Sequence, residues 1–175
     1  MQEDAWVTLS SAINTIFAKQ QSKLSFEVLY RNAYNLVLWK HGEFLYSNIR
    51  ETVTVHLQGQ TQLIAAQNGD EFMSTLQRQW KDFKLAITLI RDVCMYLDRT
   101  WVEKQPVKEV FEMGLDLFRD IVARDDRIRS RLLSTMLDYI ARERMGKVIP
   151  RDIAKTMVDM WCARCLLCGV SLPVC

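Results

Sequence analysis

Four cysteines near the end of the sequence come closest, by type and spacing, to a site for chemistry. Cys162, Cys165 and Cys168 follow the pattern CxxCxxC, and Cys175 is the last residue. Four thiolates can hold zinc, but a structural zinc site usually pairs two CxxC turns across a loop of a dozen or more residues. Because these four cysteines lie within fourteen residues, we interpret them as reduced thiols and keep a zinc site as the alternative.

No other group of residues matches a catalytic, metal-binding or phosphate-binding pattern. The two histidines, His41 and His56, have no partner at a spacing such as HExxH. The patterns GxGxxG and GxxxxGKS/T do not occur, and the carboxylates are scattered over the polar faces of the expected helices. The sequence therefore predicts a protein that is not an enzyme and that has no cofactor.

The composition argues against several classes of partner. With 23 basic and 21 acidic residues, the net charge of +2 gives no general attraction to nucleic acid or acidic lipid. A basic surplus between Arg124 and Arg151 has no aromatic residues interleaved with it, so we interpret it as a solvated helix face. No apolar run of about 18 residues occurs, and the N-terminus MQEDAW is acidic where a signal peptide is basic. Together with an odd cysteine count, these features predict a soluble intracellular protein that binds neither nucleic acid nor membrane.

Hydrophobic periodicity predicts an all-α fold, a bundle of long helices in one domain. Ser25 is expected to cap the second helix, and Gly42 to end it in the left-handed conformation. Pro106 is expected in the first turn of the fifth helix, which restarts near Asp125 and ends before Gly146. The expected helices cover residues 4–19, 25–41, 43–67, 70–103, 106–145 and 151–160.

The helix expected at residues 70–103 has one continuous apolar seam. Its spacing predicts a rod of roughly 50 Å at 1.5 Å per residue. A seam of this length indicates either packing inside the bundle or pairing with a second chain. Its positions alternate in steps of four and three: Phe72, Leu76, Trp80, Phe83, Ile87, Ile90, Cys94, Leu97 and Trp101.

The helix expected at residues 25–41 carries more apolar surface than one core needs. One narrow arc holds Leu29, Ala33 and Leu36, and a neighbouring arc borders Glu27 and Arg31. Aromatic rings beside an arginine are typical of protein interfaces. This neighbouring arc is either a docking surface or the margin of the core. Its members are Phe26, Tyr30, Tyr34 and Val37.

A second unexplained face lies on the long helix. Leu85, Leu89 and Tyr96 share it, with Asp92 and Arg99 beside them. We interpret it as a face that packs against another helix of the bundle, with docking of a partner as the alternative.

The stretch LSFEVLYRNAYNLVLWKHGEFLY resembles the start of a cullin, of the cullin-3 type that uses BTB-domain adaptors. The segments AITLIRDVCMYLDRTWV, GLDLFRDIV and LLSTMLDYIARERMGKVI resemble the following helices of the first cullin repeat, in the same order. On this resemblance, residues 4–160 form a first cullin repeat that binds adaptors, and residues 161–175 form a divergent cysteine-rich tail.

The resemblance also implies a partner and a contact surface. In that family the second helix of the repeat and the later helix with the MYLDR segment dock on the BTB adaptor. Phe26 and Tyr30 would be hydrophobic anchors, and Glu27, Arg31 and Arg99 would set orientation at the rim. The implied contact residues are Leu24, Ser25, Phe26, Glu27, Tyr30, Arg31, Tyr34, Tyr96 and Arg99.

The sequence departs from the family pattern in three places. The chain begins almost at the first helix, without the N-terminal extension that adds adaptor contacts, so we expect weaker binding. Val28 replaces a second glutamate and removes the capping-box partner of Ser25. From Trp161 the resemblance stops, and no C-terminal domain follows, so we do not expect a RING protein to bind.

The sequence thus predicts a scaffold subunit fragment of a cullin-RING ubiquitin ligase, which binds BTB-domain adaptors in the cytoplasm and nucleus. The alternative is a helical structural module that self-associates through the seam from Phe72 to Trp101.

Overall fold

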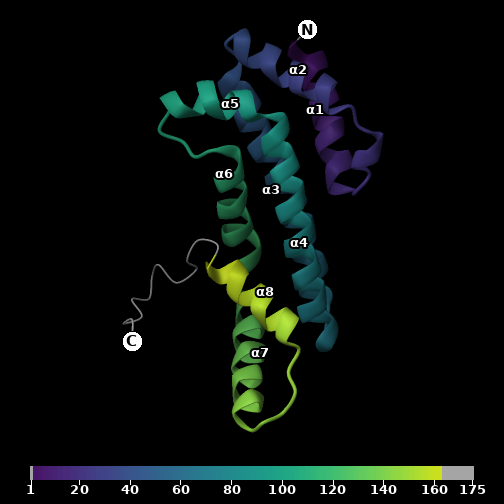
Figure 1. Ribbon diagram of the computed structural model, residues 1–175, viewed down its shortest axis with the longest axis vertical. Helices are drawn as coiled ribbons and strands as arrows, with labels where there is room; N and C mark the ends of the chain where they lie inside the picture. Colours follow the sequence, from purple (N-terminus) through teal and green to yellow (C-terminus); the bar gives the residue numbers. More distant parts are fainter. Residues whose placement is uncertain (1, 163–175) are drawn as a thin grey trace. The chain divides into compact units, whose positions relative to one another are not determined.

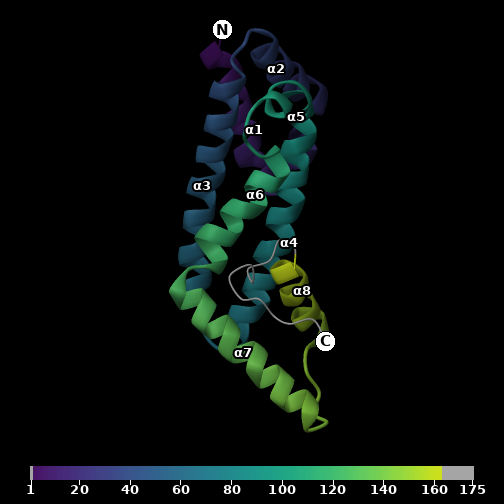
Figure 2. The ribbon, with the colours of Figure 1, turned by 90° about the vertical axis from the view of Figure 1, so that its left-hand side faces the viewer.

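The computed structural model describes residues 2–162, and all regular structure in this range is helical. The predicted all-α fold is therefore confirmed. Two compact units can be distinguished within it, residues 2–56 with 81–117 and residues 57–80 with 118–162. Figures 1 and 2 show the eight α-helices of this range. They are α1 (Gln2–Phe17), α2 (Phe26–Leu38), α3 (Gly42–Ala66), α4 (Asp70–Val93), α5 (Met95–Thr100), α6 (Val110–Phe118), α7 (Asp126–Arg144) and α8 (Arg151–Cys162).

The C-terminal end of α2 is closed by Lys40 rather than by Gly42. Lys40 has a φ of 65°, and its N–H donates to the carbonyl of Val37 at 3.0 Å, while the N–H of His41 donates to Leu36 at 2.9 Å. This pair of bonds is a Schellman motif, which places the left-handed residue two positions earlier than predicted. The prediction for Gly42 is wrong, because Gly42 is the first residue of α3.

Gly42 is needed for packing instead. A Cβ atom at this position would lie 2.5 Å from Cγ of Trp101, so only a glycine lets the indole approach the start of α3 so closely. At the other end of α2, Ser25 has extended backbone and makes no side-chain cap bond. Its carbonyl accepts the N–H of Leu29 at 3.1 Å, so α2 begins where predicted but without the predicted hydroxyl cap.

The long rod predicted for residues 70–103 is broken at Cys94. This residue has φ −98° and ψ 15°, and α5 leads away from the axis of α4 after it (Figure 1). The seam itself is confirmed as core, since its positions from Phe72 to Leu97 are buried on both sides of the break. Burial raises the pKa of the Cys94 thiol to about 12, so the thiol stays protonated and packs as a small apolar group.

The start of α6 is set by Asp98, not by Pro106. The N–H of Val110 donates to the Asp98 carboxylate at 3.0 Å, which satisfies one of the open donors of the first turn. Pro106 lies before the helix, so its predicted place in the first turn is wrong. The hydroxyl of Tyr46 donates to the carbonyl of Lys108 at 2.8 Å and fixes the same connection to α3.

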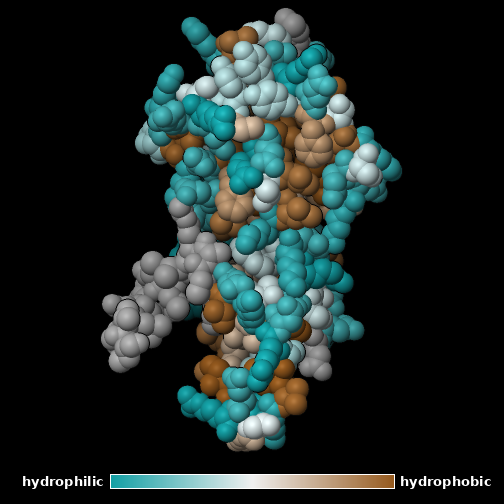
Figure 3. Space-filling view, in the orientation of Figure 1, coloured by the Kyte–Doolittle hydropathy of each residue, from teal (hydrophilic) through white to brown (hydrophobic). Residues whose placement is uncertain are grey.

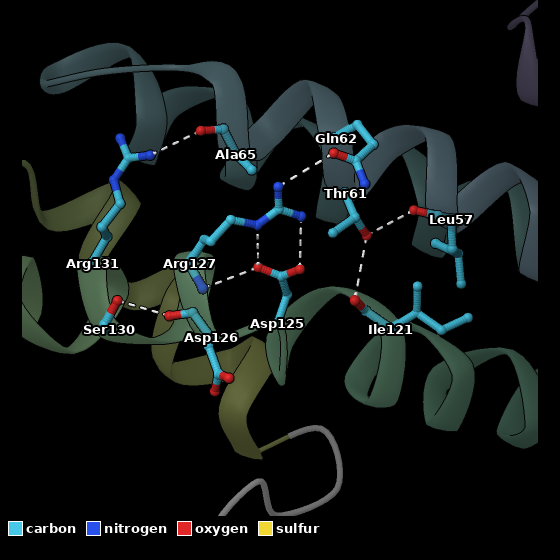
Figure 4. A network of polar contacts seen from close by, with 10 residues as sticks. All are labelled: Leu57, Thr61, Gln62, Ala65, Ile121, Asp125, Asp126, Arg127, Ser130 and Arg131. Carbon is cyan, nitrogen blue, oxygen red and sulfur yellow. Dashed lines mark hydrogen bonds and ion pairs between the residues drawn. The ribbon is translucent and has the colours of Figure 1, made fainter.

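In the second unit, arginines of α7 close the end of α3 (Figure 4). Arg131 donates to the carbonyls of Ala65 and Gln67 and lies over the ring of Phe72, 4.1 Å from its centroid. Asp125 caps α7 by accepting the N–H of Arg127 at 3.0 Å, and it forms an ion pair with the same arginine. Arg127 and Arg131 belong to the basic segment that was predicted to be a solvated face. Both make polar contacts within this unit, so that prediction holds only for part of the segment.

Two glycines in helices give opposite predictions for stability. A Cβ at exposed Gly59 would meet no other atom within 4 Å, whereas a Cβ at Gly114 would lie 2.4 Å from Cγ1 of Ile87. Gly59→Ala should raise the free energy of unfolding by about 0.5–1 kcal/mol, because alanine loses less backbone entropy on folding. Gly114→Ala should lower it, since the buried Ile87 must move. Urea unfolding of both variants checks this, and an equal response of the two would contradict the packing described.

Candidate functional site

The arc of α2 beside its core residues carries most of the predicted contact residues. Leu29, Ala33 and Leu36 are buried, as the core arc predicted. On the other arc, Phe26 and Tyr30 are each 37% exposed. Ser25, Glu27 and Arg31 are exposed as well, and Leu24 and Tyr34 are half-buried. The core arc of α2 is therefore confirmed, whereas the neighbouring arc is only partly exposed, since Tyr34 and Val37 are half-buried.

The rings of Tyr34 and Tyr96 join α2 to α5. Their centroids lie 4.4 Å apart at an interplanar angle of 46°, and Tyr30 stacks on Tyr34 at 6.4 Å. Figures 1 and 2 show α2 and α5 side by side in this unit. The three tyrosines form one continuous aromatic row, which we call the tyrosine row, and it links two segments more than sixty residues apart in the sequence.

Charged side chains lie on the same two helices as the tyrosine row. Arg31 Nη2 and Glu27 Oε1 are 2.8 Å apart one turn along α2, and both side chains are well exposed. An exposed pair of this kind adds at most a few tenths of a kcal/mol to helix stability, so both groups stay available to a partner. Arg99 is exposed on the last turn of α5.

The second predicted face is only partly assembled. Tyr96 and Arg99 lie on α5, but Leu85, Leu89 and Asp92 lie on α4, before the break at Cys94. Leu85 is exposed and Leu89 is half-buried. Asp92 forms an ion pair with Arg91 at 2.7 Å. Of this predicted face, Tyr96 is the residue whose ring contacts α2, through Tyr34.

Several exposed apolar residues on or next to these helices were missed at the sequence level. Val28 on α2 and Met95 on α5 are exposed, as are Leu38 and Trp39 at the end of α2. From the sequence, Val28 indicates only the loss of a capping partner for Ser25. The sequence did contain a signal for these residues. Apolar residues occur on every side of α2, which is more than one buried face requires.

Asp98 is a further residue that sequence reasoning missed. It lies on α5 beside Leu97 and is buried, with the N–H of Val110 as its donor. Burial raises its pKa to about 6, against the opposing effect of the Val110 hydrogen bond. The sequence signal that could have identified Asp98 is its position directly after Leu97, a residue of the apolar seam. It acts on the site indirectly, because it ties α5 to the first turn of α6.

With this geometry established, comparison with known proteins identifies the family. A family model described as the cullin alpha solenoid domain matches residues 6–165. The chain belongs to the cullin family. The resemblance inferred from the sequence is confirmed by this match, and the all-helical fold agrees with it.

Curated relatives agree with this assignment. Cullin-3A of Arabidopsis thaliana is 42% identical over 159 residues, which is 91% of this chain and 22% of that protein. Cullin-3 of Dictyostelium discoideum is 41% identical over 89% of this chain, and Cullin-3 of Caenorhabditis elegans is 36% identical over the same share. The chain spans about a fifth of the length of these cullins.

Residues 2–162 contain neither a group of metal ligands nor a membrane-spanning helix. Within the described range, no three His, Cys, Asp or Glu side chains come close enough together to hold a metal ion. Cys165, Cys168 and Cys175 lie outside the described residues, and the side chain of Cys162 is not described either. None of the helices between residues 2 and 162 combines the length and the apolar character needed to cross a membrane.

The raised pKa of Asp98 predicts a pH-dependent stability. The folded state holds the Asp98 proton up to about pH 6, whereas the unfolded state releases it near pH 3.8. Tighter proton binding by the folded state stabilises it. This stabilisation is fully present below pH 3.8 and is lost as the pH rises through about 6. Asp98→Asn keeps an acceptor for Val110 and removes the charge. Between about pH 4.5 and about pH 7.5, its stability relative to wild type should increase by roughly 2 kcal/mol. Urea unfolding at both pH values measures this, and a constant difference between the two proteins would exclude the effect.

Proposed function

We propose that this chain is the adaptor-docking part of a cullin scaffold, and that α2 and α5 bind BTB-domain substrate adaptors for ubiquitin-dependent protein degradation. Membership of the cullin family and the similarity to proteins named Cullin-3 support this proposal. The observation that carries it is the contact of Tyr34 with Tyr96, which makes one surface from the two helices that the resemblance implicates.

Each side chain of the surface has a distinct part in this proposal. Phe26 and Tyr30 present large rings that are partly exposed, and such rings can bury much area at a low loss of rotamer freedom. Glu27, Arg31 and Arg99 would surround them and select an adaptor of complementary charge. Tyr34 is half-buried, so its role would be to hold Tyr30 and Tyr96 in place.

The surface is largely formed before any partner binds. The three tyrosines already contact one another, so binding orders few side chains and loses little conformational entropy. No step of this function requires a bond to be made or broken by residues of the chain. We therefore propose a non-catalytic role, in the cytoplasm and nucleus, in which the chain holds an adaptor in position.

The alternative of self-association through the long seam has lost its physical basis. The seam positions from Phe72 to Leu97 are buried within the single chain, so they offer no apolar face to a second copy. The surface of α2 and α5 is partly exposed, which favours the docking function.

A binding experiment with a purified BTB-domain protein tests the proposal. Tyr30→Lys places a charge among the anchors, and Tyr96→Ala removes the α5 end of the tyrosine row. Each should weaken binding by about 2 kcal/mol or more, which is roughly thirtyfold in Kd, as measured by calorimetry.

Val55→Lys is a suitable control, because Val55 is exposed on α3 and lies outside the proposed surface. It should bind as wild type does. Circular dichroism of all variants verifies that they are folded. Wild-type affinity in both tyrosine variants would place the adaptor elsewhere and overturn the assignment.

A further inference from the structure

The helix α7 carries an apolar row that stays partly exposed among the described residues of the second unit. Its buried side holds Ile128, Leu132, Met136 and Tyr139. On another side, Leu133 is 41% exposed, Leu137 is 65% exposed and Ile140 is 45% exposed. Figure 3 shows hydrophobic surface beside α7, at the lower end of the view. Three large aliphatic side chains in line on one helix are typical of a helix that packs against a partner.

Polar residues extend this row of apolar residues toward both ends of α7. In steps of four and three, its members are Asp126, Ser130, Leu133, Leu137, Ile140 and Arg144, and all six are exposed. This alternation keeps all of them on one narrow strip of the helix. In Figure 4 the Asp126 carbonyl accepts the Ser130 hydroxyl, and the Asp126 carboxylate points away from the ion pair of Arg127 with Asp125. The row therefore begins with an anion and ends with a cation.

When two copies of this row lie antiparallel, the acidic end of each faces the basic end of the other, and the leucines face each other. We propose that the α7 row is an interface for a second copy of this chain, with the two α7 helices packed antiparallel. Leu133 of one copy then lies opposite Leu137 of the other, and Ser130 lies opposite Ile140. Asp126 lies opposite Arg144 at both ends of the interface.

The charges select this partner and this direction. A parallel pair would place Asp126 against Asp126 and Arg144 against Arg144, which repel, whereas the antiparallel pair forms two attractive contacts. The proposal does not depend on adaptor docking, because α7 is far along the chain from α2 and α5 and belongs to the other unit. It also differs from the seam of α4, whose apolar positions are buried.

Sedimentation equilibrium of the full chain tests for the dimer. Three apolar residues per copy form a small interface, so we expect weak association, in the range of roughly 10–500 µM. Leu137→Arg should weaken the association at least tenfold. Leu85→Arg is the matched control, since Leu85 is an exposed leucine on α4 in the other unit, and it should associate as wild type does.

Exchanging the charges tests the antiparallel register itself. Asp126→Arg alone and Arg144→Asp alone each create two repulsive contacts, so each variant should associate at least tenfold more weakly than wild type. An equimolar mixture of the two should restore association, because one copy then carries two cations in the row and the other carries two anions. A folding defect cannot produce this recovery, since mixing does not repair it.

Three results would each overturn the proposal. The first is a wild-type chain that stays monomeric over the whole concentration range, which would leave the row to a different partner. The second is a mixture that associates no better than the single variants. The third is a Leu85→Arg control that dissociates like Leu137→Arg.

Discussion

The position of α5 is the constraint on which the candidate surface depends. This helix has only six residues, too few to be stable alone, so its direction must come from contacts with its neighbours. The Asp98 carboxylate accepts the N–H of Val110, and Trp101 lies against the backbone of Gly42. Trp101 also packs on Tyr46, with 5.4 Å between the ring centroids. These contacts fix α5 at its C-terminal end and leave Tyr96 directed at Tyr34.

The same contacts connect stability with the proposed docking function. Burying the Asp98 carboxylate is unfavourable, as its raised pKa indicates, but the hydrogen bond that it accepts orders the connection between α5 and α6. The chain thus holds a partly destabilising group on the same short helix that carries Tyr96 and Arg99. Phe26 and Tyr30, the proposed anchors, are partly exposed, whereas Tyr34 and Asp98 make contacts that hold α2 and α5 in place.

Sequence periodicity predicted the helices and the two arcs of α2, because burial of one side of a helix imposes a spacing that the sequence must show. It did not predict the break at Cys94 or the role of Gly42. The role of Gly42 depends on how Trp101 packs against it, and the bond of Asp98 to Val110 likewise joins residues that no local pattern pairs. The contact of Tyr34 with Tyr96 is of the same kind, since each tyrosine only appeared as excess apolar surface on its own helix. The contact residues of the adaptor surface remain a prediction that rests on the family resemblance.

Hydrogen exchange of the chain with and without a bound BTB-domain protein tests the central claim most directly, because it reports every helix in one experiment. If α2 and α5 form one docking surface, amide exchange should slow on binding in both Phe26–Leu38 and Met95–Thr100, and it should stay unchanged in α8. Protection confined to other helices, with α2 and α5 exchanging as in the free chain, would contradict the account.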